Sequence, residues 1–145
     1  VYNNYWVLIF SYPENSHTED YRQEVLNLVN AQRARYGLTA LEMGDDALTA
    51  AAQTRAEEIS VVNSHVRPDG SKCFTVLKDY GITDTPTGEN AAWGSVSPEE
   101  VVNAWMNSEG HRANILNPEA RKMSVGYYYN SNSTWGHQWI QIFTK

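Results

Sequence analysis

The C-terminal part of the chain alternates in hydropathy with a period of two residues, and this pattern most limits the folds that the chain can adopt. From Lys122 to Tyr129 every second side chain is large and apolar, namely Met123, Val125, Tyr127 and Tyr129. A polar loop at 130–136 follows, and the alternation returns from His137 to Phe143. Because successive side chains of a strand point to opposite faces, two such runs joined by a short polar loop predict an antiparallel β-hairpin.

Helical patterns precede this hairpin. Apolar residues from Tyr21 to Val29 follow the spacing of one helix face, and Thr18 can cap the start. Another helix is expected after Asp45, and another after Ser97, where Ser-Pro-Glu-Glu forms a capping sequence. Between them, Gly88–Trp93 is typical of a short strand. Helices around a few strands predict an α+β fold, with a mainly antiparallel sheet covered by helices.

The stretch from Trp105 to Pro118 contains a helix end followed by a short helical turn. Gly110 is the expected end of the first helix, because glycine enters the left-handed region at little cost. His111 and Arg112 follow this break, where side chains can point into a cleft. The simpler interpretation is a polar corner in which His111 is a hydrogen-bonded spacer.

Composition excludes several functions. The net charge of −6 argues against nucleic acid or an anionic membrane as the main partner. The most apolar run, Tyr5–Phe10, is far shorter than the roughly 20 residues that span a bilayer, and it lacks the basic start of a signal peptide. Cys73 is the only cysteine, so no intramolecular disulfide can form.

Four titratable residues lie beside glycines and turns: His65, Glu89, Glu109 and His111. Two imidazoles with one or two carboxylates could bind Zn²⁺ and leave a position open for water, or form an acid/base pair. The alternative is a hydrogen-bonded network that ties loops together, with Glu89 as acceptor. Spacing alone does not separate these interpretations. Cys73 with a histidine is a weaker candidate for a nucleophile–base pair, because a lone cysteine is typical of a buried small hydrophobe.

Four motifs occur in an order that closely resembles the CAP/SCP superfamily of cysteine-rich secretory proteins, venom allergens and pathogenesis-related proteins. The match is to the bacterial SCP-like extracellular branch and covers about residues 19–145. The motifs are Ser-His-Val-Arg-Pro-Asp-Gly at 64–70, Gly-Glu-Asn-Ala-Ala at 88–92, Trp-Met-Asn-Ser-Glu-Gly-His-Arg-Ala-Asn-Ile-Leu at 105–116 and Trp-Ile-Gln-Ile-Phe at 139–143.

The resemblance implies an α-β-α sandwich with helices on both faces of a small antiparallel sheet, and a central cleft lined by histidines and acidic residues. His65 and His111 match the two family histidines and are the expected ligands of Zn²⁺ or another divalent cation. Glu89 matches the glutamate of the Gly-Glu-Asn motif. The second glutamate of the eukaryotic members is replaced by Ser108, so Glu109 is the candidate substitute. The residues expected to line the cleft are His65, Glu89, Asn90, Ser108, Glu109, His111 and Arg112.

The resemblance also implies a secreted or cell-surface protein. We therefore expect residues 1–17 to form an arm or linker and residues 18–145 to form a CAP/SCP domain. Its expected function is to bind a divalent metal and a small-molecule, lipid or peptide ligand, as a monomer or as part of a larger envelope protein that is not transmembrane. The alternatives are a metal-assisted hydrolase, with Glu89 or Glu109 as the hypothetical catalytic carboxylate, and an interaction domain.

Overall fold

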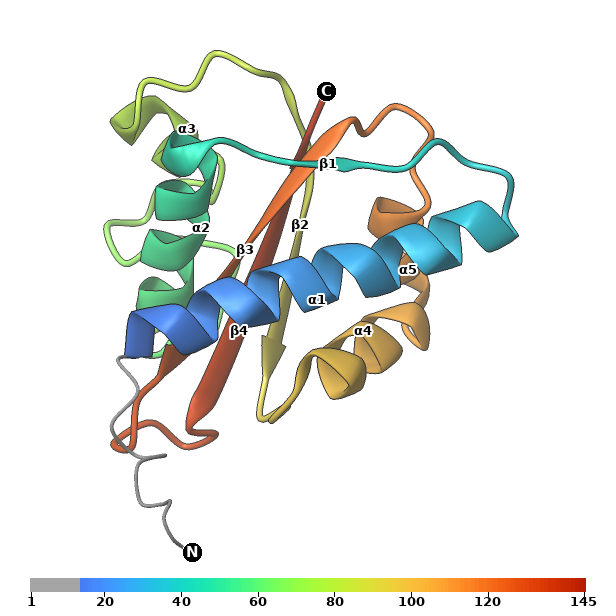
Figure 1. The fold of residues 1–145 in the computed structure, drawn as a ribbon. Helices are drawn as coiled ribbons and strands as arrows, with labels where there is room; N and C mark the ends of the chain where they lie inside the picture. The colour runs from blue at the N-terminus through green and yellow to red at the C-terminus, as the bar shows by residue number, and fades with distance from the viewer. Residues whose placement is uncertain (1–13) are drawn as a thin grey trace, which may run out of the picture.

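The computed structural model describes residues 14–145, with side chains from Tyr21 onward. Within this range the chain forms helices and a four-stranded sheet (Figure 1). The elements are α1 (Glu14–Arg35), β1 (Glu42–Met43), α2 (Asp46–Ile59), α3 (Thr75–Asp79), β2 (Pro86–Trp93), α4 (Pro98–Met106), α5 (Glu109–Ile115), β3 (Lys122–Tyr129) and β4 (His137–Thr144).

The sheet has the order β1-β3-β4-β2. β3 and β4 form the predicted hairpin, and β2 pairs antiparallel with the other side of β4, so that Glu89 lies opposite Ile142. β1 pairs parallel with β3 through Glu42 and Met43, a segment in which the sequence predicts only a link. The sheet is therefore mixed with an antiparallel majority.

Helices cover both faces of the sheet, which confirms the predicted α-β-α sandwich (Figure 1). On one face Trp139 and Phe143 of β4 pack into a core with α1, α4 and α5. On the other face Ile140 and Ile142 pack with α2 and α3. The period-two pattern of β4 thus supplies apolar side chains to two separate cores, which is why almost the whole strand is buried.

The first helix begins earlier than the sequence predicts. α1 begins at Glu14, four residues before Thr18, so the expected boundary between an arm and the domain falls inside a helix. The remainder of the expected arm, including Tyr5–Phe10, lies outside the described residues.

The prediction that Gly110 ends a helix in the left-handed region is wrong. α4 ends at Met106, and Gly110 lies in the first turn of α5 without a positive φ. The chain changes direction at Ser108, whose φ of −118° and ψ of 124° are those of an extended residue. Because this conformation is open to any amino acid, the corner does not need a glycine.

Alanine substitutions at two glycines are expected to change the free energy of unfolding in opposite directions. A Cβ on Gly126 of β3 would lie 2.1 Å from the backbone oxygen of Ala52, whereas a Cβ on Gly110 would meet nothing within 4 Å. Gly126→Ala is expected to lower the free energy of unfolding by about 1–3 kcal/mol, because α2 must move off the sheet. Gly110→Ala should raise it by about 0.5–1 kcal/mol, because alanine favours an exposed helix. Urea unfolding measures both, and equal effects would contradict the close packing of α2.

Candidate functional site

A fully buried arginine, Arg55, connects α2 to the centre of the site. It lies on the same buried face of α2 as Ile59, so its guanidinium enters the interior. Its Nε donates to Glu89 Oε2 (2.8 Å), and its Nη2 donates to Glu89 Oε1 (3.1 Å) and to the backbone oxygen of Ser64 (3.0 Å). Its Nη1 donates to Glu58 Oε1 (2.7 Å). The buried charge is therefore paired with two carboxylates.

Glu89, on β2, is the acceptor at the centre of the site. Its residue is only 6% exposed, and both carboxylate oxygens accept hydrogen bonds. Burial alone would raise the pKa of this carboxyl, but the hydrogen bonds from His65 and Arg55 outweigh it and hold the pKa below its usual range. Glu89 is consequently an ionised carboxylate at neutral pH.

His65 projects from the loop between α2 and α3 and is oriented by Glu89. Its Nδ1 lies 2.7 Å from Glu89 Oε1, while 54% of its side chain is exposed. The hydrogen bond to Glu89 raises the pKa of His65. Because an ionised carboxylate only accepts hydrogen bonds, Nδ1 carries the proton, and in the neutral imidazole Nε2 keeps a free lone pair.

The loop that carries His65 is closed by a second set of ion pairs. Arg67 Nη2 lies 2.7 Å from Glu58 Oε2, and Arg67 Nη1 lies 2.8 Å from Asp79 Oδ2. A β-bridge between Val66 and Lys72 joins the two arms of the loop. Together with the bond from Arg55 to Ser64, these contacts hold the backbone on both sides of His65.

His111 lies on α5 and is joined to β2 by its backbone. Asn90 Nδ2 donates to the backbone oxygen of His111 (3.1 Å), and Asn114 Nδ2 donates to Asn90 Oδ1 (2.8 Å). The Nδ1 of His111 is buried and has no hydrogen-bond partner among the side chains described from Tyr21 onward or the backbone of residues 14–145. Burial lowers the pKa of His111, and the nearby charge of His65 lowers it further. The fold therefore joins the backbone of His111 to Asn90, the residue next to Glu89.

The other residues predicted to line the cleft have different positions. Asn90 is fully buried within its amide network. Arg112 Nη1 donates to the backbone oxygen of Met106 (3.0 Å) and so satisfies the C-terminal turn of α4. Ser108 is half-buried at the start of α5. Glu109 is exposed, and its side chain makes no hydrogen bond or ion pair in the described part of the chain, so its catalytic role stays a prediction.

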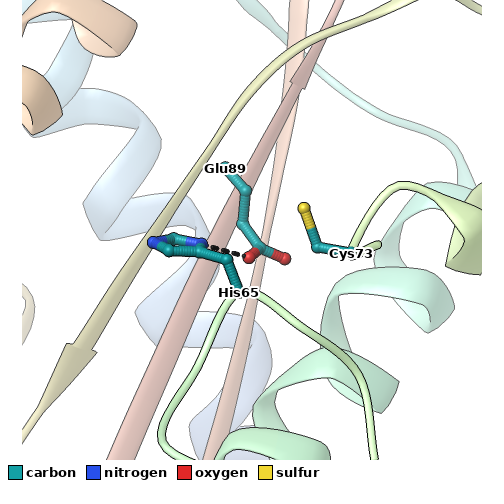
Figure 2. Close-up of side chains that lie close together, drawn as sticks. All are labelled: His65, Cys73 and Glu89. Atoms are coloured by element: carbon teal, nitrogen blue, oxygen red, sulfur yellow. Dashed lines mark hydrogen bonds and ion pairs between the residues drawn. The ribbon is translucent and has the colours of Figure 1, made fainter. Parts of the chain in front are cut away.

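The structure brings Cys73 to the same place as His65 and Glu89, as Figure 2 shows. One potential ligand atom from each of the three residues lies within 4.8 Å of the others. Among the side chains described from Tyr21 onward, these three form the group that could hold a metal ion, and the group contains Cys73 and not His111. Cys73 is a buried free thiol, and burial raises its pKa to about 11.

Sequence reasoning missed Arg55 and the place of Cys73. A signal for Arg55 exists, because it interrupts an apolar helix face that comprises Leu48, Ala51, Ala52, Ala56 and Ile59. An arginine in such a position needs a buried anion, and Glu89 is one of few candidates. No local signal indicates that Cys73 approaches Glu89, because the contact depends on how α3 packs against the sheet.

Comparison with known proteins identifies the family. The model of the cysteine-rich secretory protein (CAP) family matches residues 26–143. The chain belongs to the CAP family. This confirms the resemblance based on the four motifs.

Individual relatives of this CAP domain are bacterial. Protein YkwD of Bacillus subtilis is 42% identical over 122 residues, which are 83% of this chain and 47% of YkwD. Membrane protein YlbC of the same species is 31% identical over 115 residues, covering 76% of this chain and 33% of YlbC. A crystal structure of an extracellular SCP-domain protein from Bacillus anthracis has a TM-score of 0.77 at 25% identity, covering 88% of this chain and 41% of that one.

The chain therefore spans about half or less of the length of these curated relatives. Helices within residues 14–145 are all too short or too polar to cross a membrane.

Proposed function

We propose that this CAP domain is a secreted or cell-surface binding module that holds a divalent metal ion, Zn²⁺ in the first instance, through His65 with His111 beside it. A location outside the cytoplasm is supported by the extracellular B. anthracis protein that shares the fold. The observation that carries the proposal is a half-exposed imidazole whose Nδ1 is held by a buried, ionised carboxylate.

This arrangement suits metal binding for a specific reason. Metal-binding histidines characteristically donate their other ring N–H to a carboxylate, which fixes the tautomer and makes the free nitrogen more basic. His65 and Glu89 have this geometry, with 2.7 Å between Nδ1 and Oε1. The unpartnered Nδ1 of His111 is a second donor atom that finds no hydrogen bond within residues 14–145. A bound Zn²⁺ would act as a Lewis acid toward a ligand oxygen.

A separate groove, whose lining includes both chain neighbours of Cys73, offers a place for a larger ligand. It has a volume of about 600 Å³ and lies between α3 and the start of β2. Apolar side chains, Phe74, Leu77, Ile82 and Pro86, and the two lysines Lys72 and Lys78 line it. Such a lining favours the small-molecule, lipid or peptide ligand that we propose over a strongly charged polymer.

Calorimetric titration of Zn²⁺ at neutral pH tests the proposal. We expect saturable binding of one ion, weakened more than about tenfold by His65→Ala and also by His111→Ala, because each variant removes a ligand nitrogen. His137→Ala is the matched control, because its imidazole instead bonds the Tyr127 hydroxyl in the hairpin. Absence of binding, or binding that His65→Ala leaves unchanged, would refute the proposed function.

A metal-assisted hydrolase is the second candidate, favoured by the same His65–Glu89 pair. Both oxygens of Glu89 are engaged and its pKa is lowered, so Glu89 is better suited to orient His65 than to accept a proton. Hydrolysis of a fluorescent protein substrate that depends on Zn²⁺ and is lost in His65→Ala would support this candidate. A third interpretation, an interaction domain of a larger envelope protein, predicts partner binding that survives His65→Ala.

A further inference from the structure

We propose that His65, Cys73 and Glu89 form a site for a thiophilic divalent cation, in which the Cys73 thiolate is a direct ligand. The inference deepens the metal-binding function proposed above and rests on it. It extends that proposal in the donor set, because the sulfur of Cys73 and an oxygen of Glu89 join the histidine nitrogens. The evidence is the position of the three side chains (Figure 2): His65 and Cys73 come from the two arms of the loop between α2 and α3, Glu89 comes from β2, and they converge.

The distances between the donor atoms are close to those of a metal centre. Zn²⁺ lies about 2.3 Å from sulfur and about 2.0–2.2 Å from nitrogen or oxygen, so its tetrahedral ligands are roughly 3.3–3.7 Å apart. The three donor atoms already lie within 4.8 Å of one another. Metal binding therefore requires the donor atoms to move by about 1 Å at most.

Arg55 does not block this site. Its shortest bond to Glu89 runs from Nε to Oε2 (2.8 Å), whereas its contact with Oε1 is longer (3.1 Å). Oε1 is also the oxygen that lies 2.7 Å from His65 Nδ1. A cation between His65 and Oε1 would therefore leave the Nε–Oε2 bond intact. Arg55 then serves as the hydrogen-bond donor that metal-binding carboxylates characteristically have.

The donor set selects the class of cation. Sulfur, nitrogen and a single carboxylate suit Zn²⁺, Co²⁺ or Cd²⁺, whereas Ca²⁺ and Mg²⁺ require oxygen ligands. Binding forms one bond between the metal and Cys73 Sγ, breaks the S–H bond and releases that proton to solvent. A neutral His65 binds the metal through its unprotonated nitrogen and releases no proton, so the net release is one proton. No oxidant or reductant is needed.

Co²⁺ spectroscopy tests the inference on the intact chain. Thiolate bound to Co²⁺ gives a sulfur-to-metal charge-transfer band in the near ultraviolet, and nitrogen and oxygen ligands do not. We expect this band in the wild type and in His111→Ala, and its loss in Cys73→Ser together with more than about tenfold weaker binding. X-ray absorption of the Zn²⁺-loaded wild type should show a scatterer at about 2.3 Å, and this measurement does not depend on any variant folding.

The outcomes separate the two proposals. The role of Cys73 would be overturned if Co²⁺ bound through His65 without a charge-transfer band and the Zn²⁺-loaded protein showed no scatterer at the sulfur distance. The proposed function would still stand. A band that His65→Ala leaves unchanged at the same Co²⁺ concentration would also overturn the inference, because the thiolate would then bind the ion without His65. Absence of any binding of Co²⁺ and Zn²⁺ would refute both.

Discussion

Replacing Arg55 with methionine is expected to lower the free energy of unfolding by about 3–5 kcal/mol, one of the largest effects for a single substitution in this chain. The reason is that the negative charge of Glu89 remains in the interior after the guanidinium is removed. Glu89 is 6% exposed, and without the guanidinium its ionised carboxylate stays in the interior, keeps its bond to His65 and loses both bonds from Arg55. The backbone oxygen of Ser64 also loses its donor. Urea unfolding at neutral pH measures the loss.

A double-variant cycle distinguishes this cause from lost packing. Arg55→Met/Glu89→Leu removes both charges and fills the space with apolar groups, so we expect it to be more stable than Arg55→Met alone. Arg112→Met is the matched control, because Arg112 donates to a neutral backbone oxygen and its loss should cost only about 1 kcal/mol. Equal losses in the Arg55 and Arg112 variants, or additive effects in the cycle, would contradict a buried ion pair at the centre of the site.

The layers of the fold could be predicted because their signals are local. The period-two pattern of β3 and β4 and the helical spacing around Val25 and Val101 need no knowledge of distant residues. The two-residue strand β1 is too short to carry a pattern and exists only because β3 lies beside it. Gly110 was a misleading signal, since glycine permits a left-handed helix end without requiring one.

The site was predictable only in part, because several of its contacts depend on how distant segments pack together. Family motifs indicated His65, Glu89 and His111; the structure pairs His65 with Glu89 and joins His111 to the neighbouring Asn90 through its backbone oxygen. The ion pair between Arg55 and Glu89 joins residues 34 positions apart and results from how α2 packs on the sheet. Cys73 likewise reaches Glu89 only through the packing of the segment before α3. Contacts of this kind are fixed by tertiary structure, so the linear spacing of the residues carries no information about them.

The same carboxylates should make the protein acid-labile. The pKa values of Glu89 and Glu58 are lowered in the folded state, because hydrogen bonds from His65, Arg55 and Arg67 outweigh the effect of burial. In the unfolded chain a glutamate titrates near about 4.3. Below that pH the unfolded state binds more protons than the folded state, so the stabilisation by both groups is present above about pH 4.3. It is lost as the pH falls through their folded pKa values.

We therefore expect the free energy of unfolding to fall by on the order of a few kcal/mol between about pH 5 and pH 2. Urea unfolding across this range measures the slope. Glu89→Gln should be less stable at neutral pH, because Arg55 loses its anion, yet should show a shallower decline in acid because one linked proton is gone. Glu99→Gln, exposed on α4, should keep the wild-type slope. If Glu89→Gln declined as steeply as the wild type, Glu89 would not be an ionised partner of Arg55, and the electrostatic basis of the site would be wrong.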